Sequence, residues 1–362
     1  MQVIKKFLIE FFVGVNVFVA LLTLLSGLSS FAHPTIAPYF SLLGLAFPIF
    51  LIVNLVFILF WLLFSPRRVW IPLVSLLVCF PFVRDYCPVN MPKEEAEGTI
   101  KVMSFNVESF DNCRRDEAGN YVIPTYLFQS KADIICMQET FMTGGLTWTW
   151  MNDIMRRNGY YLGRIHGGRT GGVTCYSKLP ILSTRLIDYE SKSNASILLE
   201  LKYNNDTIYV INNHLESIKF SHKDRKQYKE IFTEPQQENV EAGARAIISK
   251  MSKAAALRGR QVDRVAEVVD SLQGKPIILC GDLNDSPISY ACQQFTRNLK
   301  SAYVQSGNGV GFTYHEGGFL VRIDHIMYSK EWESYGTYID KTMKNSDHYP
   351  LITKLKISKN AR

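Results

Sequence analysis

The chain has 362 residues, of which 47% are hydrophobic and 20% are charged, and its formal net charge is a modest +7. No internal repeat or low-complexity tract is present, which excludes repeat arrays and low-complexity polymers. The hydrophobic residues are unevenly distributed, because residues 11–66 contain no Asp, Glu, Lys or Arg, whereas the sequence after residue 93 carries the mixed charges of a soluble domain.

Residues 1–90 are predicted to form a membrane anchor. The apolar runs 7–31 and 37–64 each exceed the roughly 20 residues that span the hydrocarbon layer. A third run, 69–83, is shorter and contains two prolines. We therefore expect two or three transmembrane helices. A cleavable signal peptide is the alternative for the first run, but its apolar stretch is longer than usual and a second span follows at once.

Basic residues predict how the anchor is oriented. Lys5 and Lys6 precede the first run, Arg67 and Arg68 lie between the second and third, and residues 33–38 contain neither Lys nor Arg. Because Lys and Arg favour the cytoplasmic side, three spans place the soluble part outside the cytoplasm and two leave it inside. We expect an integral protein of a bacterial inner membrane with an extracytoplasmic domain.

After a linker at residues 91–98, residues 99–362 are predicted to form a single domain. Helices are expected at residues 151–159 and 240–272. Many short strands with interspersed helices indicate an α/β (α+β) domain dominated by sheet. The expected strands lie at residues 98–107, 132–138, 171–177, 196–202, 206–212, 276–280, 311–314, 322–328 and 350–357.

Cysteines do not decide the compartment. Cys136, Cys175 and Cys280 lie inside apolar strand-like runs, which predicts buried free thiols. A disulfide between Cys87 and Cys113 stays open at this point, and no cysteine spacing indicates a zinc site.

Polar residues recur where the apolar strands end, and they would form one cleft if those ends converge. Each alone has an ordinary structural explanation, such as a turn, a strand-end cap or a solvated loop carboxylate, so the prediction depends on their combination. They are Asn106, Glu139, His214, Asp282, Asn284, Asp324, Asp347 and His348.

These residue types suit a hard divalent cation and a phosphate ester. Glu139 and Asp347, with amide oxygens nearby, offer ligands for Mg²⁺ or Mn²⁺, which would polarise a phosphoryl oxygen. His348, oriented by Asp324, would act in acid–base catalysis or stabilise charge. Asp282, supported by Asn284, would hold and deprotonate an attacking water.

The ordered motifs SFNV, MQE, NNHL, GDLND, RIDHIMYS and SDHYPL resemble the endonuclease/exonuclease/phosphatase superfamily, which has the deoxyribonuclease I-like fold. The resemblance covers about residues 100–357, and we expect a membrane-anchored bacterial-type member. It implies a four-layered α/β sandwich of two packed, mainly antiparallel sheets flanked by helices.

The resemblance also implies roles. Glu139 would be the main metal ligand, with Asn106 beside it and Asp347 close to a metal position. His214 and His348 would contact the scissile phosphate and Asp324 would pair with His348. Asp282 and Asn284 would position the nucleophilic water and the phosphate.

Together these features predict a Mg²⁺-dependent, or Mn²⁺-dependent, hydrolase of phosphate esters that uses activated water. The membrane bilayer is the expected partner, and the favoured substrate is a phosphodiester in a lipid head group or another extracytoplasmic phosphate ester. A membrane-tethered DNA or RNA nuclease is the alternative, and a non-catalytic scaffold is a third hypothesis. Motifs that distinguish subclasses of the superfamily are replaced here by CGDLND and VRIDHI, so the substrate stays open.

A basic stretch follows His214. Residues 219–264 carry an excess of Lys and Arg over Asp and Glu, and they lie within the stretch from His214 to Leu272, which resembles an insertion between two catalytic strand ends. We expect it either to select substrate near the cleft mouth or to pack on the sandwich as a solvated helix.

Overall fold

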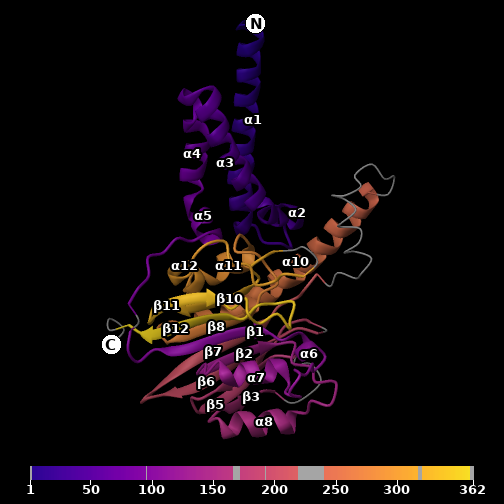
Figure 1. Cartoon of the computed structure of the whole chain (residues 1–362), viewed down its shortest axis with the longest axis vertical. Coiled ribbons are helices and arrows are strands. Elements are labelled where there is room, and N and C mark those ends of the chain that lie inside the picture. The colour runs from indigo at the N-terminus through magenta and orange to yellow at the C-terminus, as the bar shows by residue number, and fades with distance from the viewer. Residues whose placement is uncertain are drawn as a thin grey trace.

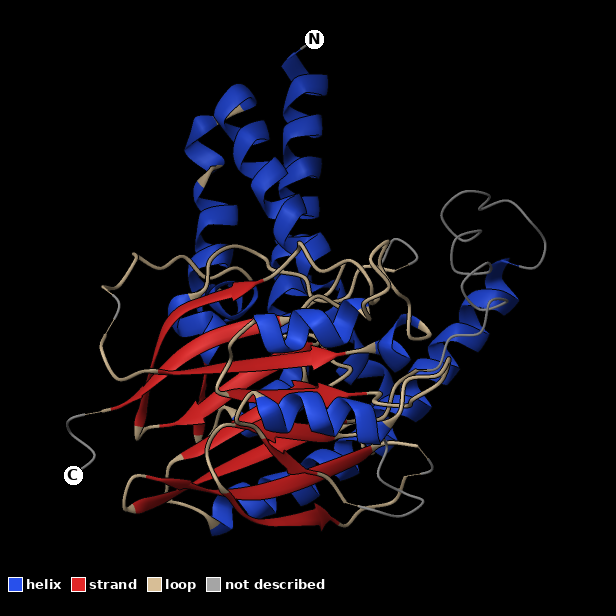
Figure 2. Ribbon diagram, turned by 60° about the horizontal axis from the view of Figure 1, so that its bottom comes forward, coloured by secondary structure: helices blue, strands red, loops and turns tan. Residues whose placement is uncertain are grey.

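The computed structural model describes residues 2–94, 96–165, 172–191, 193–218, 240–316 and 320–358. A bundle of helices from the N-terminal part stands on a sandwich of two sheets with helices on both outer faces (Figures 1 and 2). This arrangement confirms the predicted α/β (α+β) class and its four layers. The predicted limits of anchor, linker and domain stay a prediction.

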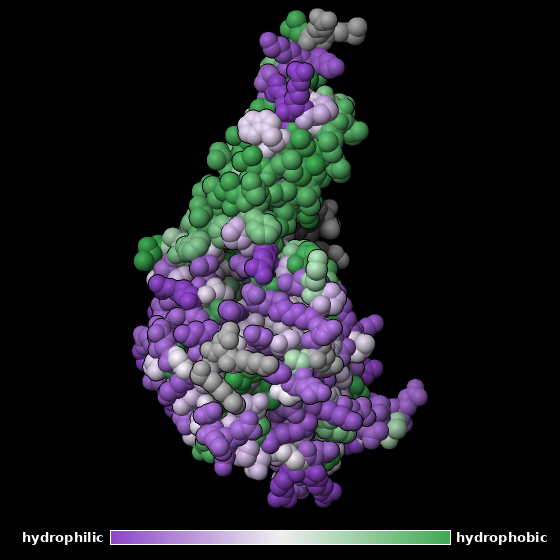
Figure 3. All heavy atoms as spheres, turned by 90° about the vertical axis from the view of Figure 1, so that its left-hand side faces the viewer, coloured by the Kyte–Doolittle hydropathy of each residue, from purple (hydrophilic) through white to green (hydrophobic). Residues whose placement is uncertain are grey.

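The bundle contains helices long and apolar enough to cross a membrane. The candidate spans are Val3–Phe31, which contains most of α1 (Gln2–Leu28), and Pro38–Phe64, which ends with α3 (Phe47–Phe64). The helices α4 (Trp70–Val78) and α5 (Phe80–Tyr86) form a pair bent by 67°, which gives three spans if the pair counts as one. On the face seen in Figure 3, the bundle surface is mainly apolar and lies above a mainly polar domain.

Polar side chains link the helices inside this bundle. Asn54 Nδ2 donates to Thr23 Oγ1 at 2.7 Å, and Trp61 Nε1 donates to Asn16 Oδ1 at 2.8 Å. Such interhelical hydrogen bonds are common where helices pack in membranes.

Short helical segments connect the bundle to itself and to the domain. Between α1 and α3 lie η1 (Ser29–Phe31), α2 (Pro38–Ser41) and η2 (Leu42–Ala46), and η3 (Pro66–Arg68) joins α3 to α4. The segments between α1 and α3 contact α10 and α11 of the domain (Figure 1), so the bundle and the domain pack against one another.

Two six-stranded sheets form the centre of the domain. The first has the order β11 (Trp332–Ile339), β12 (Leu351–Ile357), β1 (Ile100–Asn106), β2 (Ile134–Gln138), β4 (Thr174–Ser177), β3 (Tyr161–Gly163). The second has the order β5 (Ile181–Ile187), β6 (Ala195–Tyr203), β7 (Asp206–His214), β8 (Ile277–Asp282), β10 (Asp324–Ser329), β9 (Leu299–Ser301).

Each sheet has one parallel pair at its centre. These pairs are β1–β2 and β7–β8, and the other paired strands run antiparallel. Because the carboxyl ends of parallel neighbours lie at the same edge of a sheet, Asn106 and Gln138 end side by side, as do His214 and Asp282.

Side chains alternate between an inner core and two outer cores, as strand geometry requires. On β1, Val102 points between the sheets and Met103 points to the outer face. The outer face of the first sheet is covered by α6 (Glu108–Asp111), α7 (Val122–Gln129) and α8 (Trp148–Arg157), and that of the second by α10 (Val240–Ser271) and α11 (Tyr290–Phe295). The short α12 (Ala302–Ser306) packs on β9, β10 and β11.

Buried amides join the two sheets close to the edge where the parallel strands end. Asn212 Nδ2 donates to the carbonyl oxygens of Met137 and Thr174, each at 3.0 Å. Gln138 Nε2 donates to Asn212 Oδ1 at 2.6 Å. These amides therefore add directional contacts to an inner core that is rich in apolar side chains.

All seven cysteines are free, so no Cys87–Cys113 disulfide is formed. Cys136, Cys175 and Cys280 are buried, as predicted. The predicted strand at residues 311–314 is wrong, because that segment makes only isolated bridges at Tyr314. The first half of the basic insertion, residues 219–239, lies outside the described residues.

Candidate active site

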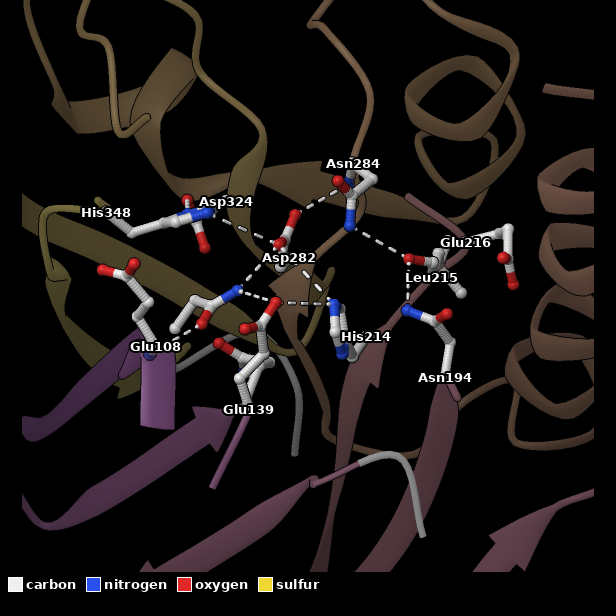
Figure 4. A network of polar contacts seen from close by, with 12 residues as sticks. Glu108, Glu139, Asn194, His214, Leu215, Glu216, Asp282, Asn284, Asp324 and His348 are labelled. Atoms are coloured by element: carbon white, nitrogen blue, oxygen red, sulfur yellow. Dashed lines mark hydrogen bonds and ion pairs between the residues drawn. The ribbon is translucent and has the colours of Figure 1, made fainter. Parts of the chain in front are cut away.

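The eight polar residues predicted from the strand ends meet at the edge where β1, β2, β7 and β8 end. Figure 4 labels Glu139, His214, Asp282, Asn284, Asp324 and His348. They come from both sheets, and each approaches at least one of the others within 4 Å. The folding therefore joins residues separated by more than 200 positions in the sequence.

Asn106 connects the two sheets at the centre of the site. Its Nδ2 donates to Glu139 Oε1 at 3.2 Å and to Asp282 Oδ2 at 3.1 Å. Asp282 is 1% exposed, and burial raises the pKa of its carboxyl, although His348 and His214 oppose this shift. Glu139 has a positive φ of 55°, a conformation that favours glycine and is concentrated at functional sites when other residues adopt it.

Two histidines approach the same carboxylates. His214 Nε2 lies 3.5 Å from Glu139 Oε1 and 3.9 Å from Asp282 Oδ2. His348 Nε2 lies 3.8 Å from Asp282 Oδ2. Both rings are buried within the walls of the site, which leaves two ring nitrogens directed at the region in front of Asp282.

His348 is held by Asp324, as the sequence predicts. His348 Nδ1 lies 2.7 Å from Asp324 Oδ2, and Asp324 is fully buried. Burial alone would lower the pKa of His348, but Asp324, Asp282 and Asp347 outweigh it and raise this pKa well above the usual value. The surrounding carboxylates therefore favour the protonated form of this ring.

Asn284 is fixed by backbone contacts. Its amide N–H donates to Asp282 Oδ1 at 2.8 Å, and its Nδ2 donates to the Leu215 carbonyl oxygen at 3.0 Å. Asn194 Nδ2 donates to that same carbonyl oxygen at 3.0 Å. With φ at 51°, Asn284 adopts a left-handed conformation that asparagine tolerates better than most residues.

Glu108 belongs to the site, and the sequence did not identify it. Its Oε2 accepts the amide N–H of Asp347 at 2.8 Å, and its own N–H donates to Asn106 Oδ1 at 3.1 Å. Glu108 begins six consecutive non-glycine residues with φ between 41° and 60°. Left-handed conformation costs about 1–2 kcal/mol per residue, and no sequence signal marks such a turn.

Carboxylates surround Asp347. Burial, together with nearby Glu108, Glu139 and Glu316, raises the pKa of Asp347 to about 7 against the lowering effect of His348. Acidic oxygens that converge in this way, with the amide of Asn106 beside them, match the oxygen ligands that hard divalent cations prefer. The donor set therefore fits the Mg²⁺ or Mn²⁺ expected from the sequence.

A second group of potential ligand atoms comprises Asp282, Asp324 and His348, whose atoms lie within 4.8 Å of one another. The 2.7 Å contact between Asp324 and His348 occupies the ring nitrogen that faces Asp324. We therefore interpret these three residues as an Asp–His pair beside a second aspartate.

Asp285, in the loop after β8, forms an ion pair with α10. Its Oδ2 accepts Arg258 Nε of α10 at 3.0 Å, and both side chains are largely buried. Arg258 also donates to the Glu216 carbonyl oxygen at 2.7 Å. The contact joins α10 to the loop after β8, across 27 residues of sequence that give no sign of it.

Residues 103–348 match the model of the Endonuclease/Exonuclease/phosphatase family. The chain belongs to the endonuclease/exonuclease/phosphatase family. A second model, described only as a domain of unknown function, matches residues 6–86. No curated protein matches the chain.

Solved structures of this family resemble the chain at low identity. Truncated Caenorhabditis elegans TDP2 is 16% identical, with 74% of this chain and 100% of that chain covered and a TM-score of 0.47. The human Nocturnin catalytic domain with bound sulfate is 16% identical, with 72% and 94% covered and a TM-score of 0.48. An endonuclease/exonuclease/phosphatase from Beutenbergia cavernae is 13% identical, with 72% of each chain covered and a TM-score of 0.47.

Proposed function

We propose that this protein is a membrane-anchored, metal-dependent phosphoesterase that hydrolyses a phosphodiester at the membrane surface, with water as the nucleophile. The observation that carries this proposal is the convergence, at one edge of the sandwich, of buried Asp282, the Asp324–His348 pair and the carboxylates around Asp347 (Figure 4). Family membership supports the reaction class.

Glu139, Asp347 and Asn106 would hold the metal, and Glu108 adds a fourth oxygen-bearing side chain beside them. A bound Mg²⁺ or Mn²⁺ would polarise a phosphoryl oxygen and offset negative charge at phosphorus.

The side chains around this metal position would handle water and phosphate. Asp282, hydrogen-bonded by Asn106 and by the Asn284 amide, would orient the attacking water and accept its proton. His214 and His348 would bind the phosphoryl oxygens, whose charge increases during attack. Asp324 would keep the His348 imidazolium in place.

The position of the site relative to the bundle supports a substrate at the membrane surface. Ile288 lies four residues after Asn284 and belongs to the same apolar cluster as Phe47, the first residue of α3. Four residues extend at most about 14 Å. The site is therefore separated by only a short stretch of chain from the apolar cluster of the bundle, and this proximity supports a lipid phosphodiester as the substrate class that we propose.

The extracytoplasmic orientation is also a proposal. Arg68 pairs with Glu10 at 2.6 Å, which puts the basic residues of η3 close to the N-terminal end of α1. The domain packs against the opposite end of the bundle (Figure 1). Because basic residues favour the cytoplasmic side, this arrangement supports three spans. A reporter that is active only in the cytoplasm, fused to the C-terminus, should be silent, and activity would contradict this orientation.

The activity test uses the full chain in phospholipid vesicles with Mg²⁺ or Mn²⁺ and a chelator control. We expect release of a phosphorylated head group or a phosphate-containing product, and Asp282→Asn should abolish it. Cleavage of DNA or RNA with a steep salt dependence would favour the nuclease instead. Failure to hydrolyse lipids, nucleic acids and soluble diesters or monoesters would favour the scaffold.

A further inference from the structure

The loop between β8 and α11, residues 283–289, connects the candidate site to the membrane bundle. Asn284 at its start lies in the site. Ile288 near its end is 2% exposed and belongs to an apolar cluster with Phe47, Cys79 and Tyr86 of the bundle. One short segment thus has a polar end among the site residues and an apolar end inside the bundle.

The bundle approaches this loop so closely that only glycine fits. A Cβ atom on Gly44 of η2 would lie 2.2 Å from the Ile288 carbonyl oxygen. Real Cβ contacts are essentially never below 3.0 Å. Any side chain at residue 44 must therefore displace the β8–α11 loop or the bundle.

A second contact holds the other end of the loop. His33, between α1 and α2, lies with Nε2 2.9 Å from Asp263 Oδ2 of α10. Tyr290, the first residue of α11, donates its hydroxyl to Asp263 Oδ1 at 2.6 Å. The His33 and Tyr290 rings also meet edge to face, with centroids 4.7 Å apart.

Helix α10 carries this contact toward the site. A Cβ atom on Gly259 would lie 3.1 Å from Pro34, so the interhelical loop of the bundle packs directly on α10 there. The preceding residue, Arg258, holds Asp285 at 3.0 Å. The β8–α11 loop is therefore fixed by the bundle directly at Ile288 and through α10 at Asp285.

We propose that the membrane bundle is a positioning element of the active site, and that Ile288, Gly44 and His33 set the position of Asn284 and Asp282 for catalysis. A bundle that served only as a tether would need nothing beyond the linker at residues 91–98. Gly44 instead packs directly on the loop that supplies a site residue, and His33 contacts α10, which holds the same loop at Asp285. This inference rests on the proposed function.

The test is Gly44→Ala in the full chain, assayed in detergent on bis(4-nitrophenyl) phosphate, a soluble substrate. A change in a simple tether should not alter the rate at which a soluble substrate is hydrolysed, whereas a change in a positioning element should. We expect kcat to fall by about tenfold to a hundredfold, since a shift of about 1 Å at a site has that effect, with KM changed by less than about twofold. Gly14→Ala in α1, where nothing lies within 4 Å of the added Cβ, is the matched control and should behave as wild type.

Hydrogen exchange of residues 283–289 gives a readout that does not depend on activity. Faster exchange in Gly44→Ala than in Gly14→Ala supports the coupling, even if the wild type hydrolyses nothing and the proposed function fails. Equal exchange together with equal kcat in the two variants overturns the inference.

A second pair of variants decides the question if Gly44→Ala does not fold. His33→Ala removes the hydrogen bond to Asp263, whereas His33→Gln retains a donor nitrogen at a similar reach. Loss of kcat in His33→Ala with recovery in His33→Gln supports positioning through α10. Wild-type kcat and wild-type exchange in both variants overturn it.

Discussion

The contact between Asp324 and His348 gives the sharpest prediction about the reaction. Asp324 Oδ2 lies 2.7 Å from His348 Nδ1, and both residues are almost completely buried. Asp324→Asn keeps the size of the side chain and can keep an oxygen toward Nδ1, but it removes the charge that stabilises the imidazolium. Substitution therefore tests the charge of His348 without opening a cavity.

The expected size of the effect follows from this geometry. A hydrogen bond to a charged group contributes about 2 kcal/mol, which corresponds to about a 30-fold lower kcat if the bond stabilises the transition state. The metal concentration for half-maximal activity should not change, because Asp324 contacts His348 and not the carboxylates around Asp347.

The assay is the initial rate on a soluble diester over a series of Mg²⁺ concentrations, with thermal unfolding as a check of the fold. Asp133→Asn is the control, because Asp133 pairs with Lys178 at 3.2 Å away from the site residues. A folded Asp324→Asn enzyme with unchanged kcat would refute the role of His348. A raised metal requirement would instead place Asp324 among the metal ligands.

Three further predictions follow from single residues. Glu139→Gln should raise the metal concentration for half-maximal activity by at least about tenfold, measured by metal titration, while leaving the unfolding temperature unchanged. Burial, together with Arg322, lowers the pKa of His325 to about 4 in the folded protein. As the pH falls, His325 is therefore protonated in the unfolded chain before it is protonated in the folded one. The contribution of neutral His325 to the free energy of unfolding is fully present above about pH 6.5 and decreases by about 3 kcal/mol toward pH 4. The free energy of unfolding of His325→Gln, measured with denaturant, should not show this decrease. Gly281→Ala should prevent folding, because its Cβ would lie 2.0 Å from the Asn213 carbonyl oxygen at a φ of 139°; Gly274→Ala, at a φ of 80° with open space, should remain folded.

The sequence predicts the site better than it predicts the complete sheets. Buried central strands are continuous apolar runs that end abruptly in polar residues, so Glu139 and Asp282 stand out at the ends of β2 and β8. The strand β5 mixes exposed and partly buried side chains at a sheet edge, and β11 alternates at the edge of the other sheet. Such half-exposed strands resemble loops in a single sequence.

Contacts that depend on tertiary structure could not be predicted. Glu108 follows Asn106 by two residues, and alone it is indistinguishable from a solvated loop carboxylate. Its place beside Asp347 depends on a left-handed turn that the tertiary structure imposes. The pairing of Arg258 with Asp285, and of His33 with Asp263, likewise depends on how α10 packs, because charge pairing over long sequence distances leaves no local pattern.

The amides between the two sheets oppose sliding of one sheet along the other near the site. Apolar contacts are non-directional, so an interface made only of apolar side chains would let one sheet slide along the other. Such sliding would separate Glu139 on one sheet from Asp282 on the other. Asn212 prevents this displacement by donating to two carbonyl oxygens of the opposite sheet. The interface thus combines non-directional apolar packing with directional hydrogen bonds from Asn212. These bonds oppose sliding of the sheets near the site, where a displacement would have the greatest effect on the chemistry.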